Sequence, residues 1–411
     1  MEGRKKYQID TEENKDFLKG QLDELIKFGR HFPAPDGTAY WLGPDGSPWK
    51  DRNRETYETA RMAHVYCLGS MLGYEGSREL AEKAISALRN SRQRDSAHGG
   101  WFSAITPEGE GIGPKLCYVN AFVILAASSG IQAGIPGSEE LLREAEDVFD
   151  RYFWEEEPGL AADTWSTDFT RLDSYRGVNA NMHTTEAFLA AADSTGDERY
   201  RDRAGSIIRH VIGWAEANDW RIPEHYTENW EPDLFCNQDK KSDPFKPYGA
   251  TPGHGIEWSR LILQYALSEK ENTKEKQICL DAAQHLFRRA VQDGWNVDGA
   301  PGIVYTTDWD GTPVVHDRMN WTLAEGINTS AVLFHQTGDR FYSECFEQFL
   351  AYLDEKVIDH EKGSWFHQLD RTNCVMDTVW PGKPDLYHAV QAMIIPYTDP
   401  ALSVASALKQ K

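Results

Sequence analysis

The stretch TPGHGIEWSRLILQYAL, residues 251–267, is followed after a short polar turn by KEKQICLDAAQHLFRRAV, residues 274–291. The first segment is apolar on most sides from residue 256 to residue 267. The second carries apolar residues at i, i+3, i+4 and i+7 between charged ones. The two segments therefore predict a buried helix followed by an amphipathic helix with one face toward solvent.

The same alternation recurs along the chain. Mostly apolar segments cover residues 59–72, 118–128, 180–191, 256–267, 321–334 and 386–395. Amphipathic, charged segments cover residues 16–32, 78–92, 139–153, 198–215, 274–291 and 340–357. Six helix pairs, repeating about every 55–75 residues, predict an all-α (α/α)6 barrel, a toroid of about twelve helices. An open α-solenoid fits the same pattern, and we expect the closed barrel. No linker interrupts the repeats, so we expect a single domain over residues 1–411.

A second repeat consists of glycine followed by aromatic or β-branched residues, at residues 99–102, 302–305 and 363–366. Polar turns at residues 106–109 and 308–311 follow the first two. This pattern predicts short β-hairpins on one face of the barrel.

Composition narrows the class of protein. The net charge of −22 argues against nucleic acid or an anionic membrane surface as a partner. No apolar stretch reaches the roughly 18 residues of a membrane span. None of the six cysteines has CxxC spacing, so we expect reduced thiols and a cytoplasmic protein. The 14 Trp and 17 Tyr residues suit a core, and also a site that stacks on sugars.

Three of the predicted inner helices begin with a nearby histidine. His183 follows an expected Asn179 cap, His254 follows Thr251 and Pro252, and His388 follows Pro384. In a barrel whose inner helices all run the same way, these three histidines would meet at one mouth. A single histidine at a helix start is usually structural, whereas three equivalent ones favour a site.

Two of these histidines have a glutamate three residues later, Glu186 after His183 and Glu257 after His254. Each glutamate could hold its own histidine ring or a substrate hydroxyl, because residues three apart share a helix face. Moving a proton beside a sugar carbonyl needs a base near neutral pH and an acid opposite it. We hypothesise that the helix dipole favours the neutral, base-competent imidazole.

Three other interpretations fit some of these residues. Two HxxE pairs on facing helices could ligate a divalent ion. A glycoside hydrolase would use two carboxylates, for which Asp163, Asp168, Glu257, Glu325 and Asp385 are available. A helical-repeat interaction module would need no site at all, which the converging histidines disfavour.

Arg61 lies in an otherwise apolar inner helix and needs a carboxylate or ligand oxygen as acceptor. The sequence has no phosphate-binding loop, dinucleotide fingerprint, nucleophile elbow or Cys/His zinc pattern. We therefore expect no cofactor, while the divalent-ion interpretation of the HxxE pairs stays open at this point.

Several of these segments together resemble a known family. They are residues 59–66, 175–188, 251–258 and 385–388, and the resemblance extends over about residues 20–397. The family is the N-acylglucosamine 2-epimerase superfamily, within which the chain most resembles the mannose isomerase and sulfoquinovose isomerase branch. The resemblance implies an (α/α)6 barrel, no metal, and reversible interconversion of D-mannose and D-fructose through a cis-enediol, with D-lyxose and D-xylulose as a further pair.

By position, His254 and His388 match the acid/base histidines of the family. The residues that match the pocket are Arg61, Tyr118, Asn179, His183, Glu257, Trp321, Glu325 and Asp385. The resemblance implies a monosaccharide substrate and leaves a monomer or a homodimer open. A sugar 2-epimerase, which returns the proton to the opposite face of C2, fits almost equally well.

The chain departs from the family pattern at three places. The loop at residues 244–248 is less basic than sulfosugar enzymes require, and His367 and Gln368 replace Asn- or Gln-type contacts. Both differences favour a neutral hexose over sulfoquinovose. Tyr57 stands where relatives have Trp, which alters the expected pocket wall.

Overall fold

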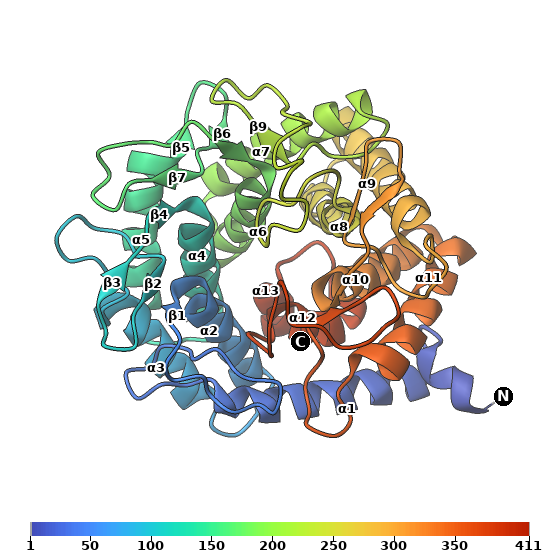
Figure 1. Ribbon diagram of the computed structural model, residues 1–411, viewed down its shortest axis with the longest axis horizontal. Coiled ribbons are helices and arrows are strands. Elements are labelled where there is room, and N and C mark those ends of the chain that lie inside the picture. Colours follow the sequence, from blue (N-terminus) through green and yellow to red (C-terminus); the bar gives the residue numbers. More distant parts are fainter. Residues whose placement is uncertain (1, 411) are drawn as a thin grey trace.

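The computed structural model describes residues 2–410, and Figure 1 shows its helices in two concentric rings. The inner ring consists of α2 (Thr56–Met71), α4 (Cys117–Gln132), α6 (Val178–Thr195), α8 (Pro252–Ser268), α10 (Asn320–Thr337) and α12 (Tyr387–Ile394). The outer ring consists of α1 (Glu12–Phe28), α3 (Ser77–Asn90), α5 (Ser138–Val148), α7 (Glu198–Ala217), α9 (Lys274–Gly294) and α11 (Arg340–Tyr352).

The inner ring is closed. Each inner helix contacts the next one, and α12 contacts α2, so no edge of the repeat is left open. The outer helix α1 packs against α12, which joins the beginning of the chain to its end (Figure 1). The predicted (α/α)6 barrel is therefore confirmed, and the open solenoid is excluded.

Burial explains the two kinds of helix. Inner helices such as α8 are buried along almost their whole length, because they are covered by an outer helix on one side and by the barrel interior on the other. In α9 only one face is buried, at positions such as Cys279, Ala283 and Phe287. A helix with apolar residues on most sides is therefore covered on most sides, and a helix with one apolar face is covered on that face alone.

All twelve predicted helices are present, with shifted ends. Single turns of 3-10 or π-helix extend α1 (η2, Gly29–His31), α5 (η3, Phe149–Phe153), α11 (η4, Leu353–Val357) and α12 (η5, Ile395–Tyr397). Two further short helices, η1 (Glu2–Tyr7) and α13 (Val404–Lys409), were not predicted from the sequence.

The expected starts of the inner helices are partly wrong. Thr251 is the N-cap of α8 and Pro252 its first residue, as predicted. The Asn179 cap is wrong, because Gly177 is the N-cap and α6 begins at Val178. Strand pairing extends to Gly177, so the chain turns into the helix earlier than the cap pattern indicates.

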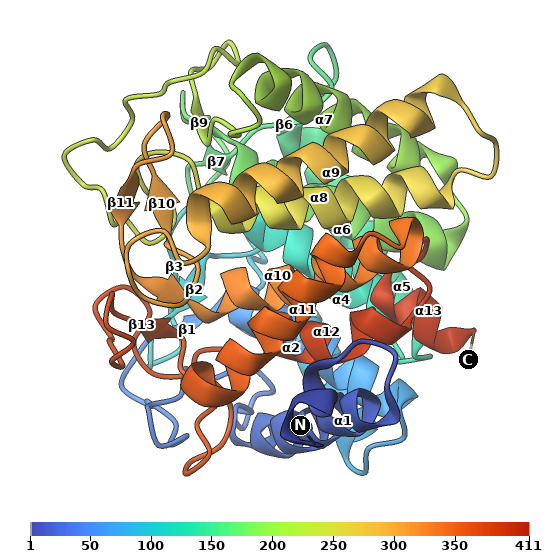
Figure 2. The same cartoon turned by 90° about the vertical axis from the view of Figure 1, so that its right-hand side faces the viewer.

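Short antiparallel strands gather at the end of the barrel opposite α13 (Figure 2). They are β1 (Arg54–Glu55), β2 (Ala104–Ile105), β3 (Gly111–Ile112), β4 (Lys115–Leu116), β5 (Trp154–Glu155), β6 (Leu160–Ala161), β7 (Thr164–Trp165), β8 (Arg176–Gly177), β9 (His225–Tyr226), β10 (Thr306–Thr307), β11 (Pro313–Val315), β12 (Arg318–Met319) and β13 (Gln368–Leu369). The hairpin face is thus confirmed. The glycine-aromatic segments themselves make only single bridges, at Trp101, Ile303 and Trp365, and the ladders β2–β3 and β10–β11 and the strand β13 begin after them.

These strands fix where the inner helices start. β1, β4, β8 and β12 each lead directly into an inner helix, and each pairs with a strand of the following repeat. The beginnings of neighbouring inner helices are therefore joined around one opening.

Ion pairs with a buried cation recur at the same place. A cation shortly before an inner helix binds an acidic residue in the loop after the preceding outer segment. The pairs are Arg54–Asp36, Lys115–Asp95, Arg176–Glu155, Arg318–Asp298 and Lys383–Asp359.

Within residues 2–410, none of the helices combines the length and hydropathy needed to cross a lipid bilayer. All six cysteines are free thiols, and four of them are buried.

Candidate active site

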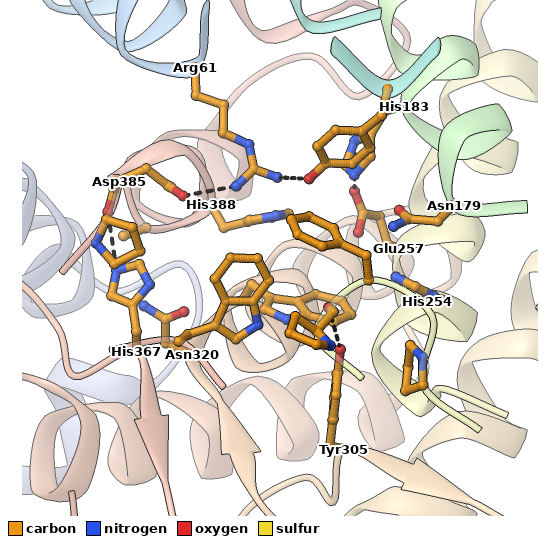
Figure 3. A pocket seen from close by; sticks show the side chains of 18 residues that line it. Arg61, Asn179, His183, His254, Glu257, Tyr305, Asn320, His367, Asp385 and His388 are labelled. Carbon is orange, nitrogen blue, oxygen red and sulfur yellow. Dashed lines mark hydrogen bonds and ion pairs between the residues drawn. The ribbon is translucent and has the colours of Figure 1, made fainter. Parts of the chain in front are cut away.

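A pocket with about 730 Å³ of unfilled space, part of it open to solvent, lies at the end of the barrel where the inner helices begin (Figure 3). Every predicted site residue except Glu325 lines it: Arg61, Tyr118, Asn179, His183, His254, Glu257, Trp321, Asp385 and His388. The structure therefore brings together residues from all six inner helices and from the loop before α12.

His254 and His388 lie beside one shared aromatic ring. The centroid of the Trp321 ring is 5.0 Å from that of His254 and 5.8 Å from that of His388. These two contacts limit how far apart the imidazoles can be. The expectation that both face a single opening is met.

Gly253 makes this packing possible. A Cβ atom at this position would lie 2.7 Å from the Trp321 ring and 2.5 Å from Thr322. Glycine therefore lets the indole lie directly against the first turn of α8, next to His254.

Each of the two imidazoles is held by a glutamate at Nδ1. His254 Nδ1 is 2.9 Å from Glu224, and His388 Nδ1 is 2.9 Å from Glu325. A carboxylate at Nδ1 fixes the tautomer that carries the proton there and makes the other nitrogen more basic. Neither Nε2 atom has a hydrogen-bond partner among residues 2–410, so both are available to a ligand in the pocket.

Of the two roles open to Glu257, that of holding the His254 ring is wrong, whereas Glu257 does line the pocket. The HxxE spacing pairs His254 with Glu257, whereas the structure places Glu224, just before β9, at its ring. The backbone N–H of Val178 donates to the carbonyl of Glu224 at 3.1 Å, which ties this residue to the start of α6. The glutamate therefore comes from a neighbouring repeat, through strand pairing that helix periodicity does not describe.

His183 is the most buried of the three histidines. Its Nδ1 lies 3.7 Å from Glu186, as the HxxE spacing predicts, and 4.0 Å from Glu257. Burial lowers its pKa to about 4, and the cation of Arg61 adds to this shift. His183 is therefore neutral at physiological pH, and its ring packs against Phe122.

Arg61 is buried, and its guanidinium donates to two acceptors, a carboxylate and a tyrosine hydroxyl. Its Nη1 donates to Asp385 at 2.8 Å, and its Nη2 donates to the Tyr118 hydroxyl at 2.6 Å. Burial opposes ionisation of Asp385, but Arg61 holds the pKa of this carboxyl below its usual value. Arg61 is thus a fixed cation in the pocket wall, connecting α2 with α4 and with the loop before α12.

Glu257 and Glu325 are held in opposite protonation states. Burial and the nearby Glu325 raise the pKa of Glu257 well above its usual range, and neither of its oxygens has a hydrogen-bond partner within the described chain. Burial also opposes ionisation of Glu325, yet Arg260 and His388 hold its pKa below the usual value. The wall therefore holds one neutral carboxyl, facing the pocket, and one carboxylate behind it.

The metal interpretation has a geometric basis. Ligand atoms of His183, Glu186 and Glu257 lie within 4.8 Å of one another, as do those of Glu257, Glu325 and His388. However, the guanidinium of Arg260 lies 2.7–3.9 Å from all three glutamates. Because this cation occupies the centre of the carboxylates, the set does not suit a divalent ion.

The carboxylates available for glycoside hydrolysis are not arranged for it. Asp163 and Asp168 do not line the pocket, Glu325 lies behind it, and Asp385 is paired with Arg61. Only Glu257 remains as a wall carboxyl without a hydrogen bond among the described residues, whereas the reaction needs two carboxyl groups flanking the glycosidic bond.

Several pocket residues were missed from the sequence. Asn320, the first residue of α10, could have been found, because it directly precedes Trp321. His367 was noted only as a departure from the family. Phe245, Tyr305 and Trp380 come from loops, where no periodicity marks an inward side chain. The ring of Phe245 meets that of Trp380 edge-on at 5.2 Å, across the mouth of the pocket.

The family model for N-acylglucosamine 2-epimerase matches residues 37–392. The chain belongs to this family. Because the match spans most of the barrel, the family resemblance inferred from the motifs is confirmed.

Three similar proteins are each named D-mannose isomerase. The chain is 43% identical to a D-mannose isomerase of Pseudomonas cannabina pv. alisalensis over 86% of this chain and 85% of that protein. It is 39% identical to a D-mannose isomerase of Thermobifida fusca, over 95% and 96% of the two chains. A solved structure of a D-mannose isomerase superposes with a TM-score of 0.86 and 28% identity, covering 93% of this chain and 97% of that one.

Proposed function

We propose that this protein is an aldose–ketose isomerase that interconverts D-mannose and D-fructose, and also D-lyxose and D-xylulose, without a cofactor. The similarity to D-mannose isomerases over most of the chain supports the substrate. The observation that carries the mechanism is the pair of imidazoles beside Trp321, each with Nδ1 on a glutamate and Nε2 free.

The reaction requires two proton movements on the open-chain sugar. A base removes the proton from C2 while an acid protonates the carbonyl oxygen at C1, which gives a cis-enediol. The enediol then loses the proton of its C2 hydroxyl and gains a proton at C1, so that the ketone forms at C2. One imidazole acts as base through an unprotonated Nε2, and the other acts as acid and enters the step with a proton on its Nε2.

The other pocket residues hold the sugar in this proposal. Arg61, Asn179 and His183 supply hydrogen bonds to its oxygens, and neutral Glu257 can donate one. The Trp321 ring covers an apolar face of the sugar chain. Tyr118 and Asp385 act on Arg61, and Glu325 acts on His388.

Incubation with D-mannose in deuterated water, followed by NMR, tests the proposal. We expect D-fructose, with deuterium at C1 wherever the transferred proton exchanges with solvent. D-glucose as the main product would indicate a 2-epimerase instead. Release of sugar from a mannoside would indicate a hydrolase, and no turnover of any aldose would contradict the enzyme assignment.

We also propose that catalysis needs no divalent ion. The cation that the buried carboxylates require is Arg260. Turnover is therefore expected to survive dialysis against EDTA, measured as the rate of D-fructose formation. Activity that disappears on dialysis and returns with an added metal would contradict this.

We propose that the protein works in the cytoplasm. Free cysteines, four of them buried, favour the reducing cytoplasm. We expect a monomer or a homodimer in which residues 1–411 act as one domain. Sedimentation analysis of the purified protein would measure the oligomeric state.

A further inference from the structure

Arg260 occupies the centre of the barrel, on α8 beyond His254. Its Nε donates to Glu325 at 2.7 Å, and its Nη2 lies 3.5 Å from Glu186 and 3.9 Å from Glu257. These residues are almost entirely buried, and Arg260 is only 5% exposed. It does not line the sugar pocket, so it cannot act by touching the substrate.

Two of the three glutamates around Arg260 also lie beside pocket histidines. Glu325 uses one oxygen for Arg260 Nε and the other for His388 Nδ1. Glu186 accepts from the hydroxyl of Tyr387 and lies beside His183. Arg260 therefore reaches the pocket through a single intervening carboxylate on each side.

The positive charge of Arg260 is needed to balance the negative charge of the buried glutamates. Three buried carboxyl groups close together cannot all be ionised without a counter-charge, because burial and mutual repulsion both favour their neutral forms. A protonated Glu325 would donate a hydrogen bond instead of accepting one from His388 Nδ1. The imidazole would then lose the contact that keeps its Nε2 unprotonated toward the pocket.

We infer that Arg260 is a positioning residue for the isomerisation: it keeps Glu325 ionised, and Glu325 in turn keeps His388 in the tautomer that presents a basic Nε2 to the sugar. This inference rests on the function proposed above. The charged or titratable groups that face Glu325 are Arg260, His388 and Glu257, and those that face Arg260 also include Glu186 and Tyr387.

The first experiment replaces the guanidinium. In Arg260→Met, kcat for D-mannose is expected to fall about 10–100-fold, the usual effect of losing a residue that orients a reacting group. KM is expected to change little, because Arg260 lies outside the pocket. Arg260→Lys, which keeps the charge but not the planar fork, should retain more activity than Arg260→Met and serves if Arg260→Met does not fold.

The matched control is Arg94→Met. Arg94 donates to Glu144 at 3.2 Å in the outer part of the barrel, away from the pocket. This variant also loses an Arg–Glu pair, and we expect its kcat to equal that of the wild type. Equal kcat losses in both variants would mean that general destabilisation explains the effect.

The pH profile distinguishes positioning from packing. Without Arg260 the pKa of Glu325 rises, so the acid limb of the kcat profile should move to higher pH in Arg260→Met. Glu325→Gln removes the titrating group, and the double variant should show no such shift and lose no more than the larger single loss. Unchanged limbs, or losses that simply multiply, would overturn the inference.

A second cavity beside Arg260 allows a test in which free guanidinium replaces the missing side chain. Arg260 also lines a hollow on the far side of the barrel, with Gln264 and Gln391, next to residues 398–404; its unfilled space of about 470 Å³ includes open solvent. Its Nη2 has no hydrogen bond in the part of the chain that the structure describes. In Arg260→Ala, guanidinium at non-denaturing concentration should enter this space and restore part of kcat, whereas His388→Ala should gain nothing.

The imidazole nitrogens of His388 provide a readout that needs no turnover. In the wild type, 15N NMR should show a protonated Nδ1 and an unprotonated Nε2, and in Arg260→Met the two tautomers should mix. An unchanged tautomer in Arg260→Met would overturn the inference even if the protein acts on another sugar. Conversely, a wild type that ignores D-mannose would contradict the proposed function alone.

Discussion

At the scale of single residues, the chemistry of the site depends on which group binds Nδ1 of each imidazole. Glu224 and Glu325 each receive an Nδ1–H, which leaves the Nε2 atom of each ring free for proton transfer in the pocket. His183 lacks such a close contact, because its Nδ1 has no hydrogen bond among the described residues. This difference supports assigning proton transfer to His254 and His388, and sugar binding to His183.

The first residue-scale prediction concerns these two bases. His254→Ala and His388→Ala should each lower kcat for D-mannose by at least about 100-fold, because general acid–base catalysis typically contributes that much. Circular dichroism should show an intact fold in both variants. His285→Ala, on the exposed side of α9, is the control and should retain full activity. Near-normal kcat in either pocket variant would remove that histidine from the mechanism.

The second residue-scale prediction concerns pH and stability. Burial lowers the pKa of His64 to about 4, from an ordinary value of 6.5. Between these values the unfolded chain binds the proton and the folded chain does not, so stability falls as the pH drops. At pH 5 this one histidine should cost about 2 kcal/mol relative to pH 7.

The measurement compares the wild type with His64→Gln, which has no titrating group at this position. The free energy of unfolding in urea should fall more steeply for the wild type between pH 7 and pH 5. The comparison is needed because the raised pKa values of Glu257 and Glu58 act in the opposite direction in both proteins. Parallel pH dependences would show that His64 is not held neutral by burial.

At the scale of elements, the repeated ion pairs and strands hold the mouth of the barrel together. Each pair connects the start of an inner helix to the loop after an earlier outer segment, for example Lys115 with Asp95 at 2.7 Å. Tyr118 lies in the first turn of the helix that follows Lys115. The pocket geometry therefore depends on contacts that do not line the pocket.

The element-scale prediction follows from the burial of this pair. Lys115 and Asp95 have side chains that are 1% and 3% exposed. Asp95→Asn would leave a buried ammonium without its counter-charge, which typically costs about 3–5 kcal/mol. Asp36→Asn, at the equivalent and more exposed pair with Arg54, should cost no more than about 1 kcal/mol. Equal losses of unfolding free energy in urea would contradict the role assigned to burial.

At the scale of the whole molecule, ring closure couples the ends of the chain. The pair formed by α1 and α12 joins segments from opposite ends of the sequence, and Arg61 binds Asp385 across 324 positions. One apolar core cluster includes residues from all six inner helices. Part of the barrel alone would expose inner helices that are apolar on every side.

We therefore predict one cooperative unfolding transition for residues 1–411. Scanning calorimetry should give a single peak whose calorimetric and van't Hoff enthalpies agree. Deleting residues 1–31, which removes α1 and uncovers α12, should lower the melting temperature of the entire barrel. Two separated peaks in the intact protein would contradict the single domain.

Local patterns in the sequence were enough to place most elements. The twelve long helices, the hairpin face and the inner positions of His183, His254 and His388 follow from periodicity and helix-start signals, because these depend on residues a few positions apart. The family motifs added Arg61 and Trp321 to the pocket, where the structure also places them.

The tertiary structure alone decided which groups act on one another. Sequence spacing assigned Glu257 to His254, but closure of the barrel brings in Glu224 and places Arg260 among the glutamates. Helix α6 begins at Val178, before the expected Asn179 cap position, because a strand from another repeat pairs beside its start. The physical reason is the same each time: hydrogen bonds and charge pairs form between whichever groups the closed ring brings within about 3 Å, and that proximity is not recorded in local periodicity.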